Sequence, residues 1–447
     1  MKYIIVIISL YIIQLIKSSE IIIPFISELS EFPKDKSPKD FMSSLSSNQL
    51  YTKIKIGTPG QSLNFNLDFN IYNSYIIKGD IKGKKINNFL YNLSSTFNYL
   101  GKEEYFSETD FIKAINSTDI FSFNENYKNY NFTFLHVYNF RSTNKIRYPG
   151  TLGFNVVPNQ EPFHFETGII YQFKKKNYTN NYVFTLKFNE NDYNGKIIIE
   201  KNIYDKYPLD YFKSDYCLAT YDYTYYWGWN YLITHLNNKL LDIKQARIKP
   251  EFGLILLHIN LKDFFRNQFF EEKIKEGKCY DDYVKYNYFY CDKDIKIDIG
   301  KLYFERKKSG LKFEFNSEDL FIEYNNKNFF LIAFGVEAEK GEVILGYPFV
   351  KKYDLIFDTD KRHVGFYNFN IKNNEDNSNN NKENDVINDN SNKNSNNKRN
   401  NNISNTEKIL LTILIIVFII LFLFFVFITF RQCQRKRKGK LFSEVFL

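Results

Sequence analysis

The sequence predicts a mostly β protein with one membrane-spanning helix near its C-terminus. Short runs rich in Ile, Val, Tyr and Phe are separated by Gly, Asn, Asp and Pro, the pattern of strands joined by turns. Helical periodicity is clearest from Asp263 to a stop at Gly277. Many strands with few helices predict barrels or sandwiches, not a doubly wound sheet. The strands expected most clearly are Tyr51–Ile56, Leu63–Leu67, Tyr182–Phe188, Lys196–Ile199, Phe329–Phe334 and Leu355–Phe357.

The two ends of the chain predict a single-pass type I membrane protein. Residues 409–430 form an unbroken run of 22 residues without a charge, long enough to cross roughly 30 Å of hydrocarbon as a helix. Residues 431–447 begin with a basic block, which the positive-inside rule places in the cytosol. Residues 1–19 have the Lys, the apolar run and the small residues of a cleavable signal peptide; an uncleaved anchor is the alternative. The expected location is the secretory pathway, at the cell surface or in endolysosomes.

Residues 371–408 consist largely of Asn, Asp, Ser and Lys. Such a segment buries too little apolar surface to offset the entropy of ordering it, so we expect a disordered linker between the folded part and the membrane. The net charge of +9 is spread among acidic residues everywhere except in the C-terminal basic block. We therefore expect no nucleic-acid partner.

Three cysteines precede the predicted membrane span: Cys217, Cys279 and Cys291. An oxidising compartment favours pairing, and the close spacing of Cys279 and Cys291 predicts a disulfide between them, with Cys217 left unpaired. Acceptor sequences for N-glycosylation fit a lumenal surface. They begin at Asn92, Asn116, Asn131, Asn177 and Asn402.

Two stretches carry a specific pattern. The first, YTKIKIGTPGQSLNFNLD, runs from Tyr51 to Asp68 and reads as a strand, a Gly-Thr-Pro turn, a Gln, a second strand and an Asp. The second, Val343–Phe366, reads VILGYPFVKKYDLIFDTDKRHVGF. They resemble the opening and the closing signature of the pepsin-like aspartic peptidase family (peptidase A1). Three residues then fall where the family has Asn-x-Trp-Val: Asn73, Tyr75 and Ile76.

Three shorter landmarks resemble the family in the expected order: Gly150–Gly153, Gly195–Ile199 and Trp229–Ile233. The resemblance covers about residues 49 to 370. It implies an all-β, bilobal fold with pseudo-two-fold related lobes, the N-terminal lobe at 49–205 and the C-terminal lobe at 206–370. Residues 20–48 would then be a short pro-segment or an N-terminal extension.

The resemblance also implies where the chemistry lies. In the family each lobe contributes one Asp-(Thr/Ser)-Gly turn, and the two carboxyl groups share a proton because like charges so close together do not both ionise. One acts as general base on a water and the other as acid toward the peptide carbonyl. Asp68 is the position of the first catalytic Asp. Its turn reads Asp68-Phe69-Asn70, so the hydroxyl and the Gly are both replaced.

The second turn can be sought by internal duplication. Asp68 precedes Gly153 by 85 residues, and the same distance back from Gly346 leads to about position 260. The local sequence is His258-Ile259-Asn260, or Leu257-His258-Ile259 in the neighbouring register, so the second Asp is missing and His258 marks its place. A His can act as a base, but an Asp-His pair would lose the shared proton. Three other acidic residues are interpreted as structural: Asp263, Asp298 and Asp358.

Tyr105 is the candidate for the Tyr of the family's flap, although the flanking sequence lacks the family's glycines. No serine-hydrolase elbow, zinc-protease helix, phosphate-binding loop or dinucleotide motif occurs, and the five His residues are scattered, so no cofactor or metal is expected. The first functional hypothesis is a monomeric pseudopeptidase that binds a peptide or protein between its lobes. The alternatives are an active, divergent aspartic endopeptidase, and a glycosylated surface protein with a structural or adhesive role.

Overall fold

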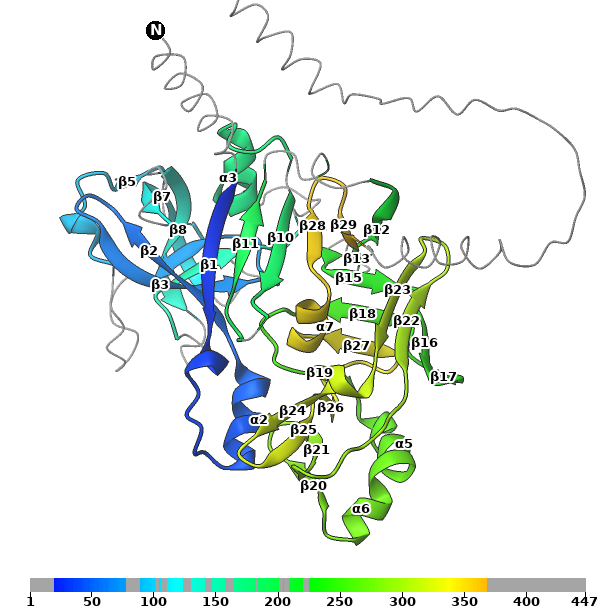
Figure 1. The fold of residues 1–447 in the computed structure, drawn as a ribbon. Helices are drawn as coiled ribbons and strands as arrows, with labels where there is room; N and C mark the ends of the chain where they lie inside the picture. Colours follow the sequence, from blue (N-terminus) through cyan, green and yellow to red (C-terminus); the bar gives the residue numbers. More distant parts are fainter. Residues whose placement is uncertain are drawn as a thin grey trace, which may run out of the picture. The chain divides into compact units, whose positions relative to one another are not determined.

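A computed structural model describes the fold, which is mostly β (Figure 1). The structure describes residues 20–77, 89–101, 104–105, 111–123, 130–140, 147–156, 165–181, 183–190, 192–200, 204, 209–219 and 225–367. The predicted signal peptide, linker, membrane span and cytosolic tail lie outside these residues. Within the described ranges no helix is long and apolar enough to cross a membrane.

The largest sheet has 14 strands and joins the N-terminal part of the chain to its last two strands. Its strands are β1 (Ile21–Ser27), β2 (Leu50–Ile56), β3 (Gln61–Asp68), β4 (Tyr75–Ile77), β5 (Asn98–Tyr99), β6 (Glu104–Tyr105), β7 (Phe111–Ser122), β8 (Tyr130–Phe140), β9 (Gly150–Gly153), β10 (Val183–Phe188), β11 (Gly195–Ile199), β12 (Phe212–Tyr216), β28 (Leu355–Asp358) and β29 (His363–Tyr367).

The other sheets lie between β12 and β28 in the chain. A 9-stranded sheet contains β15 (Gly228–Asn230), β18 (Gln245–Ile248), β19 (Ile255–His258), β20 (Cys279–Tyr283), β21 (Asn287–Asp292), β24 (Phe321–Tyr324), β25 (Lys327–Phe330), β26 (Ile332–Gly335) and β27 (Glu342–Leu345). A 4-stranded sheet contains β16 (Ile233–Leu236), β17 (Lys239–Leu241), β22 (Leu302–Arg306) and β23 (Leu311–Phe315). A small hairpin pairs β13 (Leu218–Ala219) with β14 (Tyr225–Tyr226).

Helices are short. The α-helices are α2 (Pro38–Ser47), α3 (Ile169–Lys175), α5 (Lys262–Phe265), α6 (Glu271–Lys275) and α7 (Tyr347–Lys352), and η6 (Arg266–Phe270) is a π-helical turn. The 3₁₀ turns are η1 (Glu28–Glu31), η2 (Tyr91–Leu93), η3 (Phe165–Thr167), η4 (Leu209–Tyr211), η5 (Ile259–Leu261) and η7 (Ser317–Leu320). The helix expected to stop at Gly277 is thus the continuous stretch α5, η6 and α6, and Gly277 ends it with a φ of 70°.

One arrangement of four strands occurs twice. In the first copy β3 runs parallel to β9, β9 antiparallel to β4, and β4 parallel to β8. In the second copy β18 runs parallel to β27, β27 antiparallel to β19, and β19 parallel to β26. The order and the directions match strand for strand. The two loops that leave β3 and β18 therefore occupy equivalent places.

The residues before β2 belong to the folded unit, which extends the expected folded region from residue 49 back to residue 20. β1 pairs with β11 and with β2 inside the largest sheet. Helix α2 begins at a capping box, in which Ser37 and Asp40 satisfy each other's backbone N–H groups. Its buried residues Phe41, Met42 and Leu45 join an apolar cluster built from the 9-stranded sheet.

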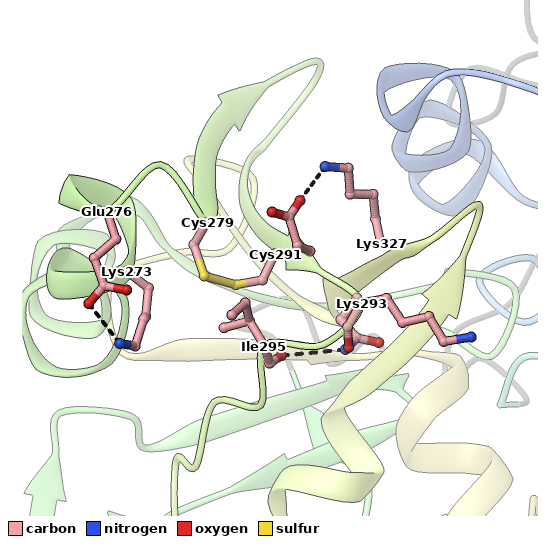
Figure 2. The surroundings of a disulfide bond; sticks show 9 residues. Lys273, Glu276, Cys279, Cys291, Lys293, Ile295 and Lys327 are labelled. Carbon is pink, nitrogen blue, oxygen red and sulfur yellow. Dashed lines mark hydrogen bonds and ion pairs between the residues drawn. A yellow bond between two sulfur atoms is a disulfide. The ribbon is translucent and has the colours of Figure 1, made fainter.

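A disulfide joins Cys279 to Cys291, which confirms the predicted pair (Figure 2). The two residues lie opposite each other on β20 and β21. Cys217 is a buried free thiol, also as expected. Figure 2 shows the ion pair between Lys273 and Glu276 of the preceding helical stretch beside this hairpin.

Most of the expected strands are observed within a residue or two, but one is not. Phe329–Phe334 is not one strand: β25 and β26 divide it at Leu331. β26 then pairs with β19, whereas β25 pairs with β21 and β24. A continuous apolar run does not reveal such a change of partners, because both strands are buried.

Candidate functional site

Asp68 ends β3 at the first of the two equivalent loops. Its carboxylate accepts a hydrogen bond from the backbone N–H of Asn70, with an N···O distance of 2.8 Å. Burial raises the pKa of Asp68 above its usual value, while N–H groups of Asn70 and Ile71 and the charge of Lys249 oppose that rise. The expected first site residue is therefore part-buried, at the start of a loop shaped by its own hydrogen bonds.

Lys249 occupies the equivalent position in the second copy. Asp68 is the last residue of β3 and lies opposite Gly153 of β9. In the second copy Ile248 lies opposite Leu345 of β27, and Lys249 follows it, donating its backbone N–H to the Leu345 carbonyl at 2.9 Å. A lysine thus occupies the position at which the duplicated topology would place the partner of Asp68.

The two copies share a structural reason for their Leu-Gly landmarks. A Cβ on Gly153 would collide with the backbone of Tyr72 in the first loop, and a Cβ on Gly346 would collide with the backbone of Phe252 in the second. Only glycine lets these strands pass so close to the loops. The repeated glycines therefore mark the two loops more reliably than the loops' own side chains do.

Glu251 brings a second carboxyl group to Asp68. The side-chain amide of Asn70 donates to Glu251 Oε1 at 2.9 Å, while the backbone N–H of Asn70 donates to Asp68. Asn70 therefore bridges the two acidic residues. Asn48, just after α2, donates from its side chain to the backbone carbonyl of Glu251 at 2.8 Å and holds the second loop in place.

The pKa of Glu251 is raised to about 7, first by burial and then by the negative charge of Asp68. Its own backbone N–H, Lys249 and Asn70 act in the opposite direction. Glu251 Oε2 is buried and has no hydrogen-bond partner among the described residues. Burial and the neighbouring Asp68 carboxylate therefore both oppose ionisation of Glu251.

A cavity of about 220 Å³ contains this site. Asp68, Lys249 and Glu251 line it, together with the chain from Ser46 to Gln49. The remaining lining residues are Asn66, Leu67, Phe252, Lys285, Tyr286 and Glu337. This volume is below the roughly 300–1,000 Å³ of pockets for drug-sized ligands. Among the residues that the structure describes, no group of three or more His, Cys, Asp and Glu side chains is arranged to hold a metal ion.

The placement of the second loop at His258 was wrong. Glu251 contacts the Asp68 loop through Asn70, whereas His258 ends β19 and caps η5, accepting the backbone N–H of Asn260 at 3.2 Å. Counting failed because Lys249 precedes Gly346 by 97 residues, whereas Asp68 precedes Gly153 by 85. The sequence did contain a usable signal: Lys249 and Glu251 are the only charged residues between the apolar ends of β18 and β19.

Other expected residues lie away from this cavity. Asp298 caps a turn at Gly300, and Asp358 accepts the backbone N–H of Lys361, so both have the structural roles expected. Asp263 lies inside the first turn of α5 and not at its N-cap, which is Leu261. Tyr105 lies in β6 opposite Lys113 of β7, and its side chain lies outside what the structure describes.

The sequons differ in exposure. The exposed residues are Asn92, Asn131 and Asn177. Asn116 lies within β7, opposite Leu135 of β8, and its side-chain oxygen is buried. A glycan needs a solvent-facing Asn, so the folded chain offers better acceptors at the three exposed positions. Asn402 lies outside the described residues.

The geometry limits what the site can do chemically. Two part-buried carboxyl groups are present, but Asn70 bridges them and the charge of Lys249 acts on both. A pair of acids that activates water needs the water between its carboxyl groups. Comparison of the sequence with protein-family models found no match, and comparison with curated proteins found none either.

Proposed function

We propose that residues 20–370 form a bilobal, pepsin-like domain that has lost peptide hydrolysis and binds a peptide or protein at the cavity between its two equivalent loops. The twofold occurrence of the four-strand arrangement supports pseudo-two-fold related lobes. The sequence signatures at Asp68 and before Phe366 support the same family. The apolar and basic terminal segments of the sequence support a lumenal location of this domain, as part of a type I protein of a secretory-pathway membrane.

The main observation that supports a loss of hydrolysis is that Lys249 occupies the position equivalent to Asp68. A Lys ammonium is a donor only, so it cannot share a proton between two acids as a second carboxyl group would. Asn70 also places its amide between Asp68 and Glu251. The site therefore suits recognition more than water activation.

Active proteolysis is a second candidate, because Glu251 supplies a second acid beside Asp68. The pair is coupled, and the pKa of Glu251 of about 7 is in the range of a general acid near neutral pH. In this alternative Asp68 is the base, Glu251 the acid, and Asn70 moves aside for the water. One experiment distinguishes the two candidates.

The experiment exposes a diverse peptide library to the full-length protein in detergent from pH 3 to 7, with mass spectrometry as the readout. The variants are Asp68→Asn and Glu251→Gln, and Asp298→Asn is the control because that carboxylate does not line the cavity and accepts hydrogen bonds from Gly300 and Ser317. We expect the wild-type protein to cleave the peptides no more than Asp68→Asn does. We also expect the wild-type protein to bind a subset of the peptides, which mass spectrometry recovers intact. Cleavage abolished by both site variants but not by the control would establish the active alternative.

A further inference from the structure

Four large apolar side chains are exposed within eleven residues of the N-terminal part of the chain. Their exposed fractions are 49% for Leu90, 56% for Leu93, 39% for Tyr99 and 49% for Leu100. The sequence from residue 86 to residue 101 contains no charged residue. Single exposed apolar side chains are common on protein surfaces, whereas a group of them without a charge marks a surface that something else covers.

The four side chains come from two neighbouring elements. Leu90 precedes the 3₁₀ turn η2 and Leu93 ends it, and residues three apart lie on the same side of such a turn. Tyr99 belongs to β5, the last strand of the largest sheet (Figure 1). Its ring centroid lies 6.1 Å from that of Tyr91 in η2, which joins the two elements. Leu100 follows β5 directly, and we call the four exposed residues the apolar patch.

Hydrogen bonds on both sides of η2 hold the apolar patch at the surface. Before the turn, the side-chain amide of Gln61 donates to the Leu90 carbonyl at 2.9 Å, and its oxygen accepts the Leu90 N–H at 2.8 Å. After the turn, the N–H of Ser95 donates to the Thr58 carbonyl at 2.9 Å, and the Ser94 hydroxyl accepts the Thr58 N–H at 3.1 Å. A rearrangement that buried the leucines would break these bonds, so their exposure is a fixed property of the fold.

An exposed acceptor for N-glycosylation lies inside the apolar patch. Asn92 stands in η2 between the two leucines, and the Leu and Ser that follow it complete the acceptor sequence. The other exposed acceptors have different surroundings: Asn131 lies between two buried aromatic residues, and Asn177 follows three lysines. Among these three acceptors, only Asn92 is flanked by exposed large apolar side chains.

We propose that a glycan on Asn92 covers the apolar patch and prevents the lumenal domain from associating with itself. The sugar rings of a glycan present C–H faces that pack on apolar side chains, while their hydroxyl groups stay in water. The inference depends on the proposed lumenal location, where glycosylation takes place, and goes beyond the proposed role of the cavity.

Membrane anchoring makes such a cover necessary. A span that confines the chains to a membrane raises their effective concentration, so even a small apolar surface favours contacts between copies. A bulky, hydrated glycan at the centre of the apolar patch opposes those contacts.

The test begins with occupancy of the acceptors. The full-length protein is produced in a eukaryotic cell, and mass spectrometry of its peptides reports the glycan at each acceptor. We expect Asn92 to be occupied in most chains. An empty Asn92 beside an occupied Asn131 or Asn177 would overturn this inference alone, whereas three empty acceptors would refute the proposed lumenal location as well. Neither outcome bears on peptide binding at the cavity.

Self-association is then measured by energy transfer between full-length chains in liposomes, where no detergent covers the apolar patch. Donor and acceptor dyes are attached to Cys433 in the predicted tail, since Cys217 is buried and the other two cysteines form the disulfide. We expect wild type to give only the transfer of randomly placed chains. Asn92→Gln should raise the transfer by about twofold or more, whereas Asn131→Gln and Asn177→Gln should leave it unchanged.

A second variant distinguishes a lost cover from a misfolded chain. Leu93→Ser removes the most exposed side chain of the apolar patch and keeps an acceptor sequence at Asn92. Combined with Asn92→Gln, it should return the energy transfer to the wild-type level. Transfer that stays high in the double variant, or that does not rise in Asn92→Gln, would overturn the proposal.

Discussion

Replacing Glu251 by Gln should make the protein more stable at neutral pH and leave it unchanged in acid. Burial and the charge of Asp68 raise the pKa of this carboxyl group from 4.5 to about 7. The folded chain therefore holds a proton that the unfolded chain releases between these values. The stability that this proton provides is complete below pH 4.5 and is lost as the pH rises to about 7.

The magnitude follows from the same two values. A difference between 4.5 and about 7, at about 1.4 kcal/mol per pH unit, makes ionisation of Glu251 cost about 3 kcal/mol of folding free energy above pH 7. Gln does not ionise, and its carbonyl oxygen still accepts from Asn70. We expect the free energy of unfolding of Glu251→Gln to equal that of wild type at pH 4 and to exceed it by about 3 kcal/mol at pH 8.

The assay is urea unfolding of both full-length proteins at 25 °C across this pH range, followed by Trp fluorescence, since Trp227 and Trp229 are buried. Glu337→Gln is a control, because its effect on the free energy of unfolding at neutral pH should have the opposite sign. Although burial acts to raise the pKa of Glu337, hydrogen bonds from Tyr286 and Lys285 lower it overall. Its variant should lose stability at neutral pH and approach wild type in acid. Parallel pH profiles for wild type and Glu251→Gln would refute the reasoning about the coupled pair.

Three other predictions concern the scaffold and use the same unfolding assay. Arg247→Ala should cost about 3 kcal/mol, because it strands the buried carboxylate of Glu342, which Arg247 contacts at 2.8 and 3.0 Å; a loss below about 1 kcal/mol would mean that water replaces the Arg. Replacing Cys279 and Cys291 together by Ala should cost about 3 kcal/mol for the short loop that they close, and reductant should then have no further effect. Phe41→Ala should cost about 3 kcal/mol, because the ring is buried between α2 and the 9-stranded sheet; an unchanged midpoint would show that α2 detaches freely.

Much of the scaffold could be predicted from local pattern. Alternating apolar residues and turn residues located β2, β3, β10, β11 and β28, because strands of this kind are specified by their neighbours in sequence. The disulfide followed from the expected oxidising compartment together with the close spacing of its two cysteines. The pairing partners could not be predicted in this way. The division of Phe329–Phe334 into two strands depends on contacts with β19 and β21, which are far away in the chain.

Only one of the two loops that form the candidate site, the loop at Asp68, was predicted from the sequence. Asp68 lies in a motif of contiguous residues, so its position could be assigned by reading along the chain. Lys249 and Glu251 lie in a loop whose role depends on where β27 and β9 return to the sheet, and that distance differs between the two copies. A search for two charged residues between apolar strands, followed by Gly253, would have found them, whereas counting residues assumed equal loop lengths.

The stability and binding experiments on Glu251 together decide whether this buried charge has a function. Gln has nearly the same shape but does not ionise, so the substitution removes the cost of about 3 kcal/mol that ionisation of Glu251 imposes above pH 7. For folding stability alone, Gln is therefore more favourable than Glu at this position. If the site recognises a peptide, the same substitution should reduce the subset of intact peptides that the protein retains from the library. A variant that gains stability and loses the ligand shows that the unfavourable charge serves recognition. A variant that gains stability and retains the same peptides as wild type does would show that the carboxylate has no role in recognition.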